Sequence, residues 1–217
     1  MLGPRRRRRH PARRRSLVRA DSLVTRHRIL VTAGSTRRAS FNTLLARAVA
    51  DELARRDREH LLVNLGDHDM PIYHGDHEDE HGVPTTAHEL AALLRDSGGL
   101  LIASPEYNGS FSPLLKNSID WVTRIDMGVL RDTLIGLMAA SPGRGGGVRG
   151  LAMVRTWFEN MRLIVAEDDL SIPQVNEHVT GESGSLAFDI EIRAAIAAWV
   201  DAYLLEFDEY CTGRPPA

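Results

Sequence analysis

Short polar side chains and two arginines gather in one stretch of the chain, Gly34-Ser35-Thr36-Arg37-Arg38-Ala39-Ser40-Phe41-Asn42. This first loop joins an apolar run at residues 28–33 to a helical pattern. Free N–H groups at a helix start, together with the positive end of the helix dipole, form a site for an anion. The hydroxyls of Ser35, Thr36 and Ser40, the Asn42 amide and the Arg37 guanidinium suit a phosphate monoester. Capping by Ser40 or Asn42 explains only one of these residues, so we favour phosphate binding over capping alone.

Two further polar stretches follow apolar runs. The second loop begins Pro105-Glu106-Tyr107-Asn108-Gly109, and the third is Ser141-Pro142-Gly143-Arg144-Gly145-Gly146. Glycines at such places let a backbone come close to a flat ligand. Main-chain groups around residues 106–108 and the Asn108 amide suit fixed hydrogen bonds to ring atoms. The first loop lacks both the Gly-Lys-Ser/Thr of a Walker loop and the Gly-x-Gly-x-x-Gly of a dinucleotide loop.

The elements that must position these loops alternate along the chain. We expect strands at residues 28–33, 60–65, 99–104, 134–140 and 163–165, and helices at 41–56, 86–96, 112–124, 148–162 and 186–210. The strands are continuously apolar, which indicates a sheet covered on both faces. The alternation predicts one doubly wound parallel α/β domain. Ligands of such sheets bind outside the carboxyl ends of the strands, where the three loops fall.

The three motifs together resemble those of the NAD(P)H-dependent FMN reductases, a family that includes flavodoxin-like quinone and azo-dye reductases. Residues 34–42 match its Gly-Ser-x-Arg-x-x-Ser-x-Asn pattern. Residues 105–121 match Pro-Glu-Tyr-Asn-Gly-Ser followed by Leu-Lys-Asn-x-Ile-Asp-Trp, and residues 141–146 match its Ser/Gly-rich turn. The resemblance spans about residues 28–205. It implies a flavodoxin-like fold with five parallel strands in the order 2-1-3-4-5 and helices on both faces.

The resemblance also implies an FMN site. The first loop would hold the phosphate, and the second and third would flank the isoalloxazine ring. The implied cofactor-binding residues are Ser35, Arg37, Ser40, Phe41, Asn42, Pro105, Glu106, Tyr107, Asn108, Gly109, Ser141, Gly143, Gly145 and Gly146. Two alternatives stay open: Glu106 as a structural acid, and Tyr107 as a core or interface aromatic. We interpret Lys116, Asn117, Asp120 and Trp121 as helix packing, local ion pairing or a subunit contact.

The implied activity is hydride transfer from NADPH or NADH to bound FMN, and then to a quinone, azo compound, free flavin or similar acceptor. The cofactor carries the chemistry, so no catalytic side chain is expected. The alternative is a flavodoxin-like electron carrier without pyridine-nucleotide turnover. The resemblance further implies a cytoplasmic homodimer or homotetramer.

Charge is distributed unevenly along the 217 residues. Residues 1–28 hold 11 Arg and one acid, whereas residues 29–217 hold 16 basic and 28 acidic residues, a net charge of −12. We expect residues 1–27 to be a disordered Arg-rich extension and residues 28–211 to be the folded domain. A secretory signal needs an apolar segment after its basic residues, and here charged residues interrupt that segment, so we do not predict such a signal. Nucleic-acid or membrane-surface binding by the extension stays open, but we favour an extension without a role. The acidic domain argues against nucleic acid, and no apolar run is long enough to span a membrane.

Histidines and acids also gather in residues 66–88, among them His68, His74, His77, His81 and His88. Imidazole and carboxylate groups bind metals, but their spacing fits no defined zinc pattern. We therefore expect residues 66–84 to form a solvated loop and predict no metal site. Cys211 is the single cysteine, which excludes an internal disulfide framework.

Overall fold

The computed structural model describes residues 27–37, 39–181 and 186–213. Residues 1–26, which make up the predicted extension except for its last residue, lie outside these ranges, as does Arg38. The extension and its boundary with the domain therefore stay predictions. No helix in the described part is both long and apolar enough to cross a membrane.

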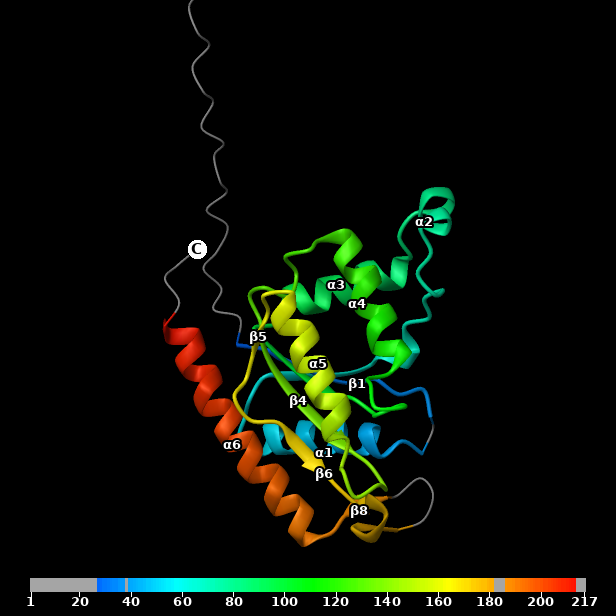
Figure 1. Ribbon diagram of the computed structural model, residues 1–217. Helices are drawn as coiled ribbons and strands as arrows, with labels where there is room; N and C mark the ends of the chain where they lie inside the picture. Colours follow the sequence, from blue (N-terminus) through cyan, green and yellow to red (C-terminus); the bar gives the residue numbers. More distant parts are fainter. Residues whose placement is uncertain (1–26, 38, 182–185, 214–217) are drawn as a thin grey trace, which may run out of the picture.

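A central parallel sheet carries the fold (Figure 1). Its strands are β1 (Ile29–Ala33), β2 (His60–Asn64), β3 (Gly99–Ala103), β4 (Leu134–Ala140) and β5 (Ile164–Val165), in the order β2-β1-β3-β4-β5. The predicted strand order is confirmed. β1 and β3 are buried along their whole length, as continuously apolar strands in a sheet covered on both faces must be.

The edge of the sheet beyond β4 differs from the prediction of a single strand. β5 pairs with the amino-terminal half of β4, and a further strand, β6 (Leu170–Ile172), pairs with its carboxyl end. Between them the chain leaves the sheet at Glu167-Asp168-Asp169. Arg155 binds this departure, donating to the carbonyl of Ala166 at 2.8 Å and to the Asp169 carboxylate at 2.5 Å. Polar residues therefore divide the apolar run, and β6 is too short for its pattern to predict a strand.

Helices cover the two faces of the sheet as separate layers (Figure 1). The helices α1 (Phe41–Arg55) and α6 (Ile190–Gly213) pack on one face, and α3 (Thr85–Arg95), α4 (Pro113–Ile125) and α5 (Val148–Asn160) pack on the other. Side chains of alternating direction along each strand supply the two cores, so Ile29 and Val31 contact the first layer and Leu30 the second. The structure thus confirms the doubly wound prediction.

Contacts between α1 and α6 fix the first layer. Arg56, at the end of α1, donates to the Asp201 carboxylate at 2.6 Å and to the carbonyl of Ala197. The buried hydroxyl of Tyr203 donates to the carbonyl of Leu134 at 2.9 Å, which seats α6 against β4. Burial raises the pKa of Tyr203 well above its usual value.

The prediction of an irregular loop over residues 66–84 is wrong in part. The segment contains a 3-10 turn, η1 (Leu65–Asp67), and a short helix, α2 (Gly75–His81). No residue of α2 is buried, so it carries no apolar periodicity that the sequence could reveal. Its Glu78 accepts from the Tyr73 hydroxyl at 3.0 Å and from Arg124 on α4 at 2.9 Å. Tertiary hydrogen bonds, rather than core burial, hold this helix against α4.

Short elements also precede α6. They are the 3-10 turn η2 (Val175–Glu177) and an antiparallel pair, β7 (Val179–Thr180) and β8 (Ala187–Phe188). The helix expected from residue 186 therefore begins at Ile190. Asp189 accepts from the N–H of Ile192 at 2.9 Å and so caps the new start.

Candidate functional site

The three polar loops follow the carboxyl ends of β1, β3 and β4, at one edge of the sheet. Gly34 donates to the carbonyl of Ala103 at 2.9 Å, which joins the first loop to the end of β3. A Cβ on Gly34 would lie 2.9 Å from Ser112 Oγ and 3.3 Å from Leu115 Cβ. Only glycine therefore lets the start of α4 approach the first loop this closely.

The first loop leaves donors available at the start of α1. Ser35 Oγ accepts from the N–H of Arg37 at 3.3 Å, and Ser40 Oγ caps the helix by accepting from the N–H of Thr43 at 3.3 Å. The N–H groups of Phe41 and Asn42 belong to the first turn, where the helix itself supplies no acceptor. These donors suit the phosphate group that the sequence predicts.

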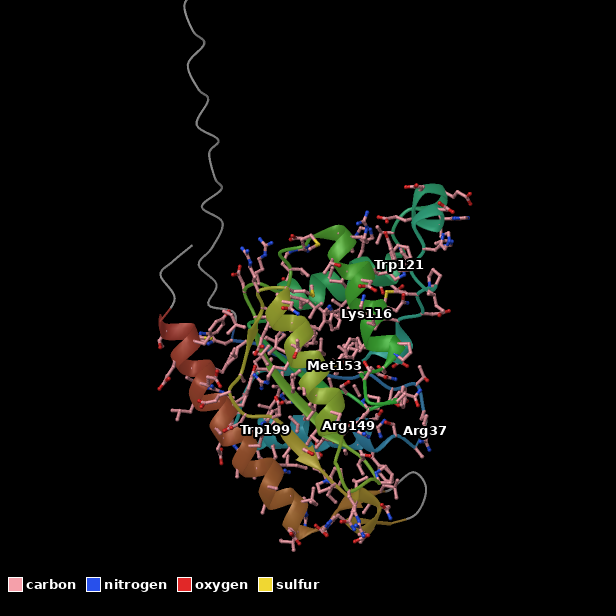
Figure 2. The ribbon with its side chains drawn as sticks, viewed as in Figure 1. Arg37, Lys116, Trp121, Arg149, Met153 and Trp199 are labelled. Atoms are coloured by element: carbon pink, nitrogen blue, oxygen red, sulfur yellow. The ribbon has the colours of Figure 1, made fainter. Side chains whose placement is uncertain are left out.

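Arg37 is exposed, and no residue within the described ranges forms an ion pair with it. Figure 2 shows it on the outside of the loop that follows β1. A free guanidinium beside an open helix start is a charge-assisted donor for phosphate oxygens. The residues present therefore fit the phosphate end of FMN.

Asn42 differs from the expected direct donor. Its buried amide donates to the carbonyl of Ala140 at 3.0 Å and accepts from the N–H of the same residue at 3.0 Å. This reciprocal pair ties the first turn of α1 to the end of β4, 98 residues away. We therefore interpret Asn42 as holding the first loop next to the third.

The second loop turns back tightly on itself. Tyr107 and Ser110 exchange two backbone hydrogen bonds, of 2.8 and 3.0 Å. Between them Asn108 and Gly109 have φ values of 53° and 79°, the type I′ pattern that favours Asn-Gly. Tyr107 is 41% exposed, and a Cβ on Gly109 would meet no atom within 4 Å. The turn thus presents its backbone to open space, as contact with a flat ring requires.

The position of the Glu106 carboxylate agrees with the alternative that this residue is a structural acid. One oxygen accepts from Arg149 Nη2 at 2.7 Å, and the other accepts from the N–H of Gly150 at 3.2 Å. The side chain therefore faces α5. Contact of its main chain with a flavin ring stays a prediction.

The segment after β5 supports the third loop, a role that the sequence analysis missed. The backbone N–H of Ser141 donates to the carbonyl of Ile172, and the N–H of Val175 donates to the carbonyl of Ser141. Gly146 has a φ of 60°, and a Cβ there would lie 2.9 Å from the nitrogen of Pro173. Gly146 is thus required by packing against residues 171–173. The positions at Gly143 and Gly145 stay more open: a Cβ at Gly143 would meet only Ser141 Oγ, at 3.5 Å, and one at Gly145 nothing within 4 Å.

Residues 145–150 have the Gly-x-Gly-x-x-Gly spacing at a strand-to-helix turn. In dinucleotide sites this pattern places a pyrophosphate on the helix start. Here Gly150 packs against Glu106, and the carboxylate accepts from its N–H. A negative charge already lies at the start of α5, which makes this helix start less favourable for a phosphate than that of α1.

The four α4 residues have the structural roles that we expected of them. Lys116 pairs with Asp120 at 2.6 Å and lies 5.3 Å from the Trp157 ring. The Asn117 amide accepts from the N–H of Tyr73, and the Trp121 indole donates to the carbonyl of Pro71 at 2.7 Å. Helix packing and local ion pairing therefore account for these contacts.

The histidine-rich stretch forms no candidate metal site among the described residues, where no group of three or more His, Cys, Asp or Glu side chains is placed to hold an ion. His77 and His81 instead stack at 4.4 Å between ring centroids. Near the third loop, His178 and the Asp189 carboxylate form a hydrogen bond of 2.9 Å. This bond raises the pKa of His178, and the N–H of Ile192 and then His178 lower the pKa of Asp189.

Comparisons with known proteins agree with this arrangement. A quinone reductase of Pseudomonas putida is 34% identical over 181 residues, covering 81% of this chain and 91% of its own. A quinone reductase of Escherichia coli K12 is 33% identical over 121 residues, and a 2-hydroxy-1,4-benzoquinone reductase of a Burkholderia species is 40% identical over 97. These two alignments cover 56% and 45% of this chain, and they span 63% and 50% of the length of the two relatives.

The fold has a close structural counterpart. The flavoenzyme NAD(P)H:(acceptor) oxidoreductase of Paracoccus denitrificans superimposes with a TM-score of 0.72 at 22% identity, covering 85% of this chain and 98% of that one. The family model described as NADPH-dependent FMN reductase matches residues 27–177, which include all three loops. The chain therefore belongs to the NADPH-dependent FMN reductase family.

Proposed function

We propose that this chain binds FMN across the three loops and is an NAD(P)H-dependent oxidoreductase. Two features carry the proposal. One is an open helix start beside Arg37, which forms no ion pair with any residue that the structure describes, and the other is a backbone turn that faces open space. Both lie at the carboxyl edge of one sheet. Membership of the FMN reductase family supports the identity of the ligand.

Each loop has its own part in this proposal. Arg37, Ser35, Ser40 and the N–H groups of Phe41 and Asn42 would bind the phosphate. The backbone of residues 105–109 and of Ser141, Gly143 and Gly145 would orient the ring and keep one of its faces accessible. When bound, FMN supplies the two-electron chemistry, accepting a hydride from a nicotinamide and passing it to an oxidant. The chain then needs to position its ligands rather than to supply an acid or base.

A quinone is the acceptor class that we propose. The names of several relatives support this choice. The competing function is an electron carrier that holds FMN without turning over NAD(P)H. Steady-state NADPH and NADH oxidation with and without benzoquinone separates the two. We expect oxidation that depends on the quinone, whereas a carrier would show none with either nucleotide.

We further propose a homodimer or homotetramer in the cytoplasm. Met153 on α5 is 49% exposed. One turn further along the same helix face, Trp157 stacks on Phe111 at 4.8 Å and lies beside Lys116. This partly exposed apolar strip adjoins the second loop, and burial by a second copy would remove it from water.

Light scattering tests the oligomer. We expect a mass of at least twice 24.1 kDa. Met153→Glu would move the protein towards the monomer, since a charge would then be buried in the contact. Leu205→Glu on α6, at a residue that is 66% exposed, is the matched control and would leave the mass unchanged. A fully active monomer would contradict the proposal.

A further inference from the structure

Glu106 occupies a particular position between the second and third loops. Its side chain is only 12% exposed, although it is a carboxylate on a surface loop. Both oxygens are used: one by Arg149 Nε at 3.0 Å and Nη2 at 2.7 Å, the other by the N–H of Gly150 at 3.2 Å. The Glu106 side chain therefore points towards the first helical turn of α5. It does not lie on the outer surface of the Tyr107–Ser110 turn.

The first turn of α5 lacks a cap from its own sequence. The residue at its start is Gly147, with a φ of 92° and no side chain to accept a hydrogen bond. The N–H of Gly150 is one of the donors that such a helix leaves unpaired. Glu106 supplies the missing acceptor from another loop, and its negative charge is favoured at this end of the helix dipole.

Direct packing accompanies the hydrogen bond. A Cβ on Gly150 would lie 3.1 Å from Glu106 Cβ and 3.3 Å from its Cα. The helix and the loop backbone are thus in contact, and a Cβ on residue 150 would require the loop to move by a few tenths of an ångström. The Arg149 side chain is 78% exposed, so its ion pair adds little to the connection.

We propose that Glu106 is a positioning residue that fastens the Tyr107–Ser110 turn to the start of α5 and thereby sets the spacing of the two loops around the flavin ring. The inference rests on the proposed function for the identity of the ligand. The contact between Glu106 and the start of α5 exists in the chain without a ligand. In this role Glu106 does not contact the reacting atoms.

Two kinds of variant test this role. Glu106→Ala removes the acceptor, whereas Glu106→Gln keeps an oxygen that accepts from Gly150. Arg149→Ala, which removes only the exposed ion pair, is the control. We expect Glu106→Ala to weaken FMN and riboflavin equally, by roughly 2- to 30-fold, the range for loss of a helix cap. Glu106→Gln and Arg149→Ala would each stay within about 2-fold of the unmodified chain, a third of a decade in affinity.

Amide hydrogen exchange without flavin supplies the readout that is independent of activity. In Glu106→Ala, exchange would accelerate at residues 107–110 and 148–151, while the amides of β1 and β3 keep their rates. General destabilisation would instead accelerate all of them. Gly150→Ala, which keeps Glu106 but forces the loop away, would give the same local pattern and serves if Glu106→Ala fails to fold.

Unchanged exchange at residues 107–110 in both variants would overturn the inference. So would a loss confined to FMN, because that would place the effect at the phosphate end. If the unmodified chain binds neither flavin, the proposed function fails, whereas the exchange result still decides whether Glu106 fastens the turn.

Discussion

Arg37 and Asn42 in the first loop illustrate how two polar side chains near one helix start take different roles. Arg37 has its guanidinium free among the described residues, while Asn42 uses its amide within the fold. The sequence predicted both as phosphate ligands. Spacing shows that a polar residue lies at a helix start, but only the tertiary structure shows which polar groups are already bonded.

Arg37→Ala tests the phosphate end. A hydrogen bond to a charged group contributes about 1.5–3 kcal/mol, so FMN binding would weaken by roughly 10- to 150-fold. Riboflavin has no phosphate, and its affinity would stay the same. Arg47, exposed on α1, is the matched control, and Arg47→Ala would change neither affinity. Equal weakening of FMN and riboflavin by Arg37→Ala would exclude the phosphate assignment.

Asn42→Ala tests the structural role of the amide. The substitution leaves the buried N–H and carbonyl of Ala140 without partners, each at a cost of about 1–3 kcal/mol. We expect the free energy of unfolding in urea to fall by roughly 2–4 kcal/mol. Asn64→Ala, which removes hydrogen bonds of 3.1 and 3.2 Å at a more exposed site, would lower it by less than about 1 kcal/mol. Equal effects would contradict the assignment.

At the scale of elements, periodicity predicted the long helices and the buried strands and missed the short ones. The apolar face of α1 and the apolar run of β3 each repeat over several residues. The helix α2 buries no residue, and β6 is three residues long and pairs only with the end of β4. Tertiary hydrogen bonds hold α2, and they leave no period in the sequence. β6 buries Leu170 and Ile172 in the core, but it is too short to show a period.

The His178–Asp189 pair joins η2 to the start of α6 and makes stability depend on pH. Because the pKa of His178 is raised in the fold, its contribution is complete below about pH 6.5 and is lost as the pH rises through the raised value. The lowered pKa of Asp189 makes its contribution complete above about pH 3.8 and lost on further acidification. The pair therefore stabilises most between these values.

His178→Asn tests this dependence through the melting temperature. The deficit of the variant relative to the unmodified chain would be greatest near pH 5–6 and would shrink above the raised pKa, where the imidazole is neutral in both states. His88→Asn, at an exposed position on α3, is the control and would show no such trend. A deficit that grows with pH would contradict the assignment.

At the scale of the whole molecule, the meeting of the three loops was predictable because parallel strands bring their carboxyl ends to one edge. The strand order followed from the resemblance to the FMN reductases. The contacts that hold the loops in place at that edge were not predictable. Residues 171–175 under the third loop and the Glu106–Gly150 contact join segments far apart in the chain. A single sequence shows which residues follow strands, but not which of them hold the others in place.

We propose that the chain binds FMN at this edge and passes electrons from NAD(P)H through it. The most direct test is the visible absorption spectrum of the purified protein reconstituted with FMN and mixed anaerobically with one equivalent of NADPH or NADH, followed by benzoquinone. We expect the oxidised flavin band to bleach with at least one nucleotide and to return when the quinone is added. A protein that binds no FMN, or whose flavin band neither nucleotide bleaches, would contradict the account.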